Sequence, residues 1–195
     1  MKLDIEAFIF YGGAIMSLLL SLYIMRFSWK QYGLLFIITA LVGEILDMLF
    51  MKLGFYHYPY DGIESMSIMP YTLVMTLFPC YILFGVRYSP SSWKYKLPFY
   101  MIIVHLGMTT EVLTQLYTDA LEYTKFWDTW DSYMWWWIFL LGFEVIGGLI
   151  VSKEHRKPIS EENFKYNHLG WYLTHFVLIL TIFLGGVYLG TKLKG

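Results

Sequence analysis

Residues 33–53 read GLLFIITALVGEILDMLFMKL, and this stretch decides the fold class. It has about the 20 residues that an α-helix needs to cross roughly 30 Å of hydrocarbon. Its charged residues are Glu44, Asp47 and Lys52. A charge near the centre of a bilayer is costly, so such residues usually face a bundle interior, a cavity or one another. The stretch therefore predicts a membrane-spanning helix whose two carboxylates face inward.

Five further apolar stretches resemble this one, at residues 7–25, 68–86, 97–117, 132–151 and 169–190. The whole chain is 57% hydrophobic and 21% aromatic with 15% charged residues, which lies outside the ordinary range of soluble domains. A water-soluble helical bundle is the alternative, but long apolar segments joined by short charged loops do not suit a soluble core. We therefore predict an all-α, polytopic membrane helix bundle of about six transmembrane helices, forming one domain over residues 1–195.

The distribution of positive charge predicts the orientation of the chain. Of the 14 Lys and Arg residues, nine fall after the first, third and fifth predicted helices and five on the other side. This bias places those loops in the cytoplasm and both termini outside the plasma membrane. No cleavable signal peptide is expected, because Asp4 and Glu6 accompany Lys2 where a basic region would be needed. The net charge is −1 with no basic stripe, so no nucleic-acid partner is expected.

Two parts of the chain resemble each other. Ser28-Trp29-Lys30 precedes the second predicted helix, and Ser92-Trp93-Lys94 precedes the fourth. Residues 44–50 and 111–117 both read Glu, β-branched, Leu, polar, variable, Leu, aromatic. The two Ser-Trp-Lys segments are 64 residues apart and the two glutamates are 67 residues apart, which is nearly the same separation. As a repeat, helices two and three would be a parallel copy of helices four and five, related by an axis along the membrane normal. Chance similarity between apolar helices is the alternative.

Carboxylates form the candidate site. Glu44 and Asp47 are three residues apart and share one face of their helix. Glu111 occurs at a corresponding depth on the fourth helix, with Gln115 one turn further out. Oxygen-rich clusters suit hard cations, and carboxylates held close together can share and carry a proton. We therefore predict an outward-facing site for a cation, a proton or a small polar ligand. The alternatives are neutral carboxyls that bond between helices, and general-acid catalysis.

Three further ionisable residues extend this polar path toward the cytoplasm. They are His105 on the fourth helix, Glu144 on the fifth and His175 on the sixth. Staggered acid and imidazole groups are what a proton relay needs. Hydrogen bonding between helices is the more ordinary role of a membrane histidine.

Aromatic residues are expected to line the outer end of the site. Tyr56, His57 and Tyr60 follow the second helix, and Trp136 lies in the tryptophan run that opens the fifth. Simple anchoring at the membrane interface is the alternative. The chain lacks Gly-x-Ser-x-Gly, His-Glu-x-x-His, Walker and Cys-x-x-Cys motifs, so neither a metal site nor a cofactor is predicted.

The arrangement resembles an uncharacterised family of small bacterial six-helix multi-pass membrane proteins. The likeness covers most of the chain and rests on the Ser-Trp-Lys loop, on Gly43-Glu44 and Asp47 before a Tyr-Pro-rich turn, and on the tryptophan-rich fifth helix. A similarity also runs to integral-membrane carotenoid cyclases and hydratases, which place glutamates on helices beside aromatic outer turns. It implies an acidic group that protonates a polyene, although the paired Pro-x-Glu-Glu pattern of the cyclases is missing here.

These observations predict a small transporter, channel or binding protein for a cation, a proton or a small amphiphile. An enzyme that acts on an isoprenoid or another lipid through glutamate general-acid catalysis is the second hypothesis. An accessory subunit whose carboxylates pair with basic residues of a partner membrane subunit is the third. The lipid bilayer is the expected environment, and Gly186 and Gly190 give a Gly-x-x-x-Gly spacing that is a weak signal for a homodimer.

Overall fold

The computed structural model describes residues 5–59, 69–165 and 167–194, with the backbone alone at 5–10, 69–71 and 194. Its elements, in chain order, are α1 (Ile5–Met25), α2 (Trp29–Lys52), β1 (Tyr56–His57), α3 (Met69–Tyr88), α4 (Trp93–Tyr117), β2 (Glu122–Tyr123), α5 (Thr129–Ile150), η1 (Lys153–His155), η2 (Glu161–Phe164) and α6 (His168–Lys194). The predicted all-α bundle is confirmed, and a two-stranded antiparallel pair is added to it.

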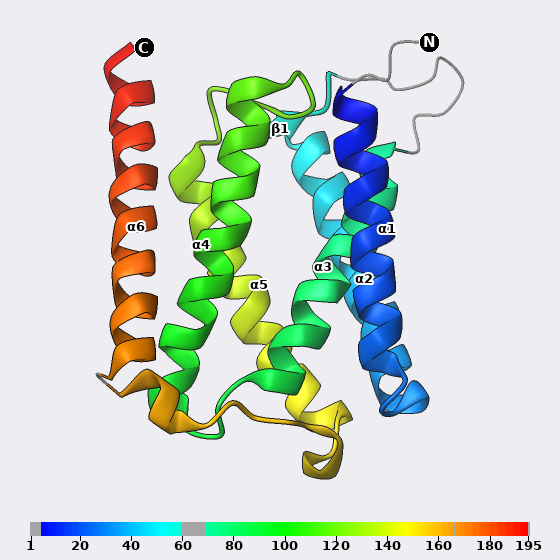
Figure 1. The fold of residues 1–195 in the computed structure, drawn as a ribbon. Helices are drawn as coiled ribbons and strands as arrows, with labels where there is room; N and C mark the ends of the chain where they lie inside the picture. Colours follow the sequence, from blue (N-terminus) through cyan, green and yellow to red (C-terminus); the bar gives the residue numbers. More distant parts are fainter. Residues whose placement is uncertain (1–4, 60–68, 166, 195) are drawn as a thin grey trace.

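The helices run up and down in one bundle, so consecutive helices point in opposite directions (Figure 1). The end that carries β1 and β2 is called the strand end, and α1 begins and α6 ends there (Figure 1). The opposite end carries the connection of residues 151–165 and is called the loop end. α1 packs against α2 and α3, α5 packs against α2, α3 and α4, and α6 lies at the edge against α4.

Four helices are long and apolar enough to cross a membrane, namely α2, α4, α5 and α6. α1 and α3 are also apolar but shorter over their described side chains, Tyr11–Met25 and Thr72–Tyr88. Large apolar side chains face outward, such as Leu149, which is 86% exposed. This surface suits contact with lipid, because outward-facing apolar groups cost nothing in a bilayer. The chain therefore has the helices and the surface of a membrane protein.

Each predicted helix is present, but most of them begin earlier than the apolar stretches suggested. Ser28 and Ser92 lie in extended backbone just before α2 and α4, so both Trp-Lys pairs are the first residues of helices rather than of loops. α2 ends where Gly54 adopts a φ of 72°, a left-handed conformation that favours glycine. Apolar content therefore located the helices but omitted their polar first turns.

Asp128 begins α5 with a complete capping box. Its side chain accepts hydrogen bonds from the N–H groups of Trp130 (2.8 Å) and Asp131 (3.2 Å), and Asp131 accepts from its N–H. Lys192 of α6 forms an ion pair with the same carboxylate at 2.7 Å. Burial opposes ionisation of Asp128, but these donors outweigh it and hold its pKa below the ordinary value. One residue thus starts α5 and ties α6 to it at the strand end.

The strand pair bears on the predicted repeat. β1 and β2 follow α2 and α4, and in their register Tyr56 faces Tyr123. The separation of these two tyrosines along the chain equals that of Glu44 and Glu111. An antiparallel pair in which corresponding residues face each other is what two copies related by a two-fold axis produce. The register is therefore the one expected of the repeat, which stays a prediction.

The core lies between α2, α3, α4 and α5. Its fully buried side chains include Tyr32, Leu35, Ile82, Leu83, Tyr100, Val104, Met108 and Leu140. Gly107 on α4 allows Trp136 on α5 to pack closely, because a Cβ at Gly107 would lie 2.7 Å from the indole ring. Gly147 on α5 likewise lies against Val86 of α3. These contacts set the spacing of α5, which carries residues of both polar clusters described below.

Candidate functional site

A cavity of about 190 Å³ lies among α2, α3, α4 and α5 at the strand end. Its walls are mostly apolar and rich in aromatic side chains. The residues that line it include Leu46, Phe50, Tyr56, Tyr58, Leu73, Val74, Leu77, Phe78, Tyr81, Trp127, Trp135, Trp136 and Phe139. Asp47 and Glu111 also line it, on α2 and α4 respectively. The fold therefore brings two of the predicted carboxylates, Asp47 and Glu111, to one cavity.

Glu111 is held by three hydrogen-bond donors. The hydroxyl of Ser132 donates to its Oε1 at 2.5 Å, and the hydroxyl of Tyr123 donates to the same oxygen. The indole N–H of Trp136 donates to Oε2 at 2.7 Å. An ionised carboxylate only accepts hydrogen bonds, so three convergent donors suit that form. Glu111 joins β2 and α5 to α4 and fixes one wall of the cavity.

Asp47 is less completely satisfied, although it is only 5% exposed. The hydroxyl groups of Tyr56 and Tyr58 both donate to its Oδ1 at 2.7 Å. Its Oδ2 is buried and has no partner among the described residues. A buried acceptor without a donor is rare and unfavourable. Asp47 therefore lacks one donor at the wall of a cavity.

The tyrosines around these carboxylates keep their protons. Burial, followed by the charge of Asp47, raises the pKa of Tyr56 and of Tyr58 above the ordinary phenol value. Burial and Glu111 raise the pKa of Tyr123 in the same way. The three phenols therefore remain hydrogen-bond donors throughout the physiological pH range.

Tyr56 and Trp136 line the cavity as predicted, whereas Glu44, Gln115 and His57 do not. Glu44 is half-buried, and its Oε2 has no partner among the described residues. Gln115 is half-buried but does not line the cavity. His57 is exposed and forms an ion pair with Glu122 across the strand pair at 3.2 Å. Tyr60 lies outside the described residues.

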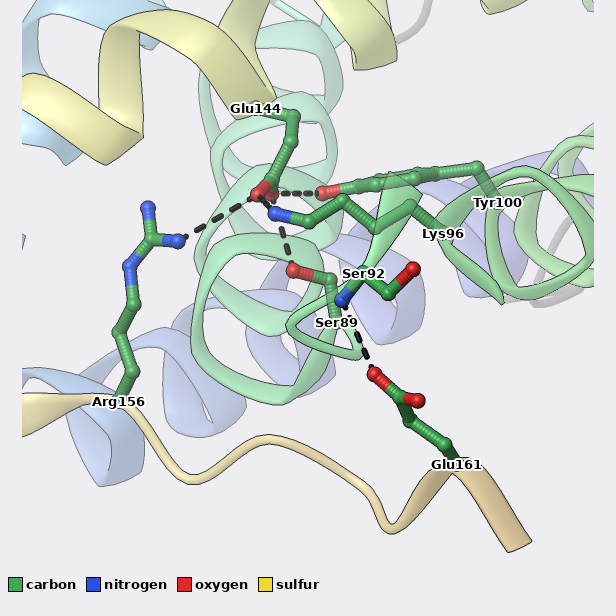
Figure 2. Close-up of polar contacts among 7 residues, drawn as sticks. All are labelled: Ser89, Ser92, Lys96, Tyr100, Glu144, Arg156 and Glu161. Carbon is green, nitrogen blue, oxygen red and sulfur yellow. Dashed lines mark hydrogen bonds and ion pairs between the residues drawn. The ribbon is translucent and has the colours of Figure 1, made fainter. Parts of the chain in front are cut away.

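A second polar cluster lies at the loop end around Glu144, which is 2% exposed (Figure 2). Lys96 forms an ion pair with its Oε1, and Arg156 lies 3.4 Å from the same oxygen. Tyr100 and Ser89 donate to Oε2 at 2.5 and 3.1 Å. Arg156 approaches from the side opposite Lys96 and Tyr100 (Figure 2). Glu144 on α5 therefore joins α4, the residue after α3, and the connection of residues 151–165.

The connection of residues 151–165 is bound beneath this cluster. The N–H groups of Lys157 and Ile159 donate to the carbonyls of Arg87 and Tyr88 at 2.8 and 2.9 Å. Glu161 accepts from the N–H of Ser92, the N-cap of α4, at 3.1 Å (Figure 2). The connection therefore covers the loop end as an ordered layer rather than a free loop.

The three residues predicted to form a relay are not joined by hydrogen bonds. His105 is buried, and its Nε2 lies 2.7 Å from Thr181 of α6. His175 stacks on Trp171 within α6, and Glu144 belongs to the cluster above. His105 therefore attaches α6 to the bundle, which is the interhelical role that the sequence left open.

Sequence reasoning missed the partners of these carboxylates. Lys96 and Arg156 lie just outside apolar stretches, where basic residues ordinarily belong to the interface. A buried Glu144 needs a cation at the same depth, and this requirement could have selected Lys96 at the start of α4. Tyr123 could have been found from the repeat, since it follows Glu111 at the same interval at which Tyr56 follows Glu44.

Within the described residues, no group of three or more His, Cys, Asp or Glu side chains could hold a metal ion. The resemblance to the small bacterial family stays a prediction. No known protein family, curated protein or solved structure matches this chain.

Proposed function

We propose that this chain is a membrane protein that binds a small amphiphile in the cavity at the strand end. The observation that carries the proposal is Asp47 Oδ2, a buried acceptor without a donor among the described residues, in an otherwise apolar, aromatic hollow. A ligand whose hydroxyl or ammonium group donates to Asp47 would supply the missing hydrogen bond. Its apolar part would fill the space between the aromatic walls. This mode of binding matches the usual composition of ligand sites, which are apolar with few polar groups.

The size of the cavity limits the ligand. An apolar protein cavity of about 150 Å³ holds one benzene molecule, and the present cavity is slightly larger at about 190 Å³. It accommodates one ring or a short branched chain, or one end of a longer lipid. Aromatic faces also attract ammonium groups. Small amines and alcohols with a cyclic or branched apolar part are therefore the class that we propose.

We also propose that all six helices span the plasma membrane, with the strand end and both termini outside. The excess of Lys and Arg in the loops at the opposite end supports this orientation. Exposed Trp29 and Trp93 near the loop end suit a membrane interface there. In this orientation the cavity receives its ligand from the outer side, as a binding protein or the outer site of a transporter would.

The test is thermal stability of the purified full-length protein with matched small molecules. Cyclohexylmethanol and cyclohexylmethylamine carry a donor, and methylcyclohexane is the apolar control. Wild type is compared with Asp47→Asn, which keeps an acceptor for Tyr56 and Tyr58 but turns an amide N–H₂ toward the ligand donor. Asp119→Asn, at an exposed residue of the same end, is the control variant.

We expect the donor-bearing compounds to raise the melting temperature of wild type and Asp119→Asn, and to have little effect on Asp47→Asn. Equal shifts with methylcyclohexane would mean that Asp47 does not recognise the ligand. No shift with any compound would count against a small-molecule site.

A second candidate function is acid catalysis on an isoprenoid, as the similarity to carotenoid cyclases and hydratases implied. The aromatic rings around Asp47 and Glu111 favour it, because such faces stabilise a passing carbocation. The protein would be incubated with isoprenoid lipids and the extract analysed by mass spectrometry. A product that disappears in Asp47→Asn but persists in Asp119→Asn would support catalysis, whereas an unchanged lipid pool would leave binding as the function.

A further inference from the structure

The loop end holds more buried positive charge than negative charge. Lys96 and Arg87 are 7% and 5% exposed, and the Arg156 side chain is 14% exposed. Among the described residues, the carboxylate that lies within ion-pair distance of any of them is Glu144. Lys96 and Arg156 therefore share one carboxylate, and Arg87 is paired with none among the described residues, in a region that water reaches poorly. Buried charges are ordinarily paired, so this end lacks a counter-charge.

Several N–H donors of the two guanidinium groups also lack acceptors. Arg156 Nε and Nη2 and Arg87 Nε are buried and have no partner among the described residues. Arg87 Nη1 donates to the carbonyl of His155 at 2.7 Å, so its guanidinium is held next to the residue that precedes Arg156. The planar guanidinium has five N–H donors in a fixed fork that matches the oxygens of a phosphate. The missing partner is therefore an acceptor-rich anion.

The surroundings place this surplus at the membrane surface. Trp29 and Trp93 are exposed near the same end and suit the interfacial belt. Lys30, Lys94 and Lys157 are exposed in the same loops and first turns. Clusters of basic residues at the ends of membrane helices attract anionic lipid head groups.

We propose that Arg156 and Arg87, with Lys96 behind them, form a binding site for a phosphate oxyanion at the loop end. Arg156 comes from the connection after α5, and its side chain remains partly exposed at the loop end. Glu144 holds the cluster together without neutralising it. The oxyanion supplies the acceptors and the negative charge that the described residues lack. Its source is either the phosphodiester of an anionic phospholipid or a soluble phosphate.

The test measures the melting temperature of the full-length protein in two settings. In the first, nanodiscs of phosphatidylcholine are compared with nanodiscs that contain phosphatidylglycerol. In the second, detergent-solubilised protein receives inorganic phosphate or chloride at equal ionic strength. Arg156→Gln removes the charge and most donors, and Lys153→Gln, at an exposed residue of the same connection, removes an equal charge as the control.

We expect phosphatidylglycerol or phosphate to stabilise wild type and Lys153→Gln, with an apparent affinity roughly tenfold or more weaker for Arg156→Gln. Stabilisation by the lipid alone identifies a head group as the ligand, and stabilisation by phosphate alone identifies a soluble anion. Equal responses of wild type and Arg156→Gln would overturn the site. So would a wild-type protein that responds to neither phosphate nor phosphatidylglycerol more than to its control.

Should Arg156→Gln fail to fold, Arg156→Lys replaces it. Lysine keeps the charge but not the guanidinium fork, so a phosphate site that uses the fork weakens while general charge attraction does not. An unchanged phosphate response in Arg156→Lys would reduce the cluster to nonspecific electrostatics and overturn the proposal.

Discussion

Replacing Glu111 by Gln tests whether the strand end is held together by a carboxylate. Glu111 accepts three hydrogen bonds on two oxygens, and Gln offers one oxygen. The better orientation keeps that oxygen on Tyr123 and Ser132 and turns the amide N–H₂ toward the indole N–H of Trp136. A lost hydrogen bond to a charged group costs roughly 1.5–3 kcal/mol. The two remaining bonds become neutral and about half as strong, so each loses roughly 0.75–1.5 kcal/mol and we expect a total loss of roughly 3–6 kcal/mol in the free energy of unfolding.

The assay is unfolding of the purified protein in a mild detergent by sodium dodecyl sulfate, followed by far-ultraviolet circular dichroism. Glu122→Gln is the matched control, because Glu122 is exposed and its ion pair with His57 lies at the surface. Such pairs contribute at most about 1 kcal/mol. If Glu111→Gln were as stable as Glu122→Gln, the three hydrogen bonds would not hold the strand end, and the inferred role of Glu111 would be wrong.

Three further predictions concern the packing and charge of the bundle. Glu144→Gln leaves two buried cations without a carboxylate and should lower the free energy of unfolding by roughly 3–5 kcal/mol in the same assay. Gly107→Ala places a Cβ 2.7 Å from the ring of Trp136, so it should lower the free energy of unfolding by roughly 1–3 kcal/mol. It should also increase the solvent exposure of Trp136, measured by tryptophan fluorescence. Because the pKa of Asp128 is lowered, the ionised Asp128 side chain stabilises the folded protein fully above the ordinary carboxyl pKa. This stabilisation is lost as the pH falls through the lowered pKa. The stability difference between wild type and Asp128→Ala should therefore be about 1 kcal/mol at pH 6 and shrink below about pH 4.

The sequence predicts the helices well because the cost of exposing polar backbone in a membrane leaves long apolar segments little choice of structure. The same reasoning selected Asp47 and Glu111 from one-dimensional depth alone, and both line the cavity. It could not tell that Glu44, on the same face of α2, lies outside the cavity wall. A helical spacing of three residues separates two side chains by about 60° around the axis, and neighbouring helices decide which of them meets a cavity.

The loop end was harder to predict because its contacts join residues far apart in the chain. Glu144 pairs with Lys96, which precedes it by 48 residues. It also pairs with Arg156, which lies in the charged connection after α5, where the sequence suggests residues exposed to water. The predicted relay of His105, Glu144 and His175 assumed that residues at staggered depths lie side by side. α6 packs on α4 at the edge of the bundle, whereas Glu144 lies on α5. His175 on α6 and Glu144 on α5 are therefore not on neighbouring helices. Helix neighbours, rather than helix positions, were the missing information.

The buried carboxylates at the two ends of the bundle have different partners, uncharged donors at the strand end and cations at the loop end. This difference decides which ligands each end suits. At the strand end, the described partners of Asp47 and Glu111 are hydroxyl and indole groups, which donate hydrogen bonds without cancelling charge. No basic side chain is among these described partners, so the cavity favours a ligand that donates a hydrogen bond or carries positive charge. At the loop end, Glu144 is outnumbered by cations, so positive charge remains and favours an oxyanion. Because the two sites lie at opposite ends of the bundle and share no residue, each ligand can be tested at its own end.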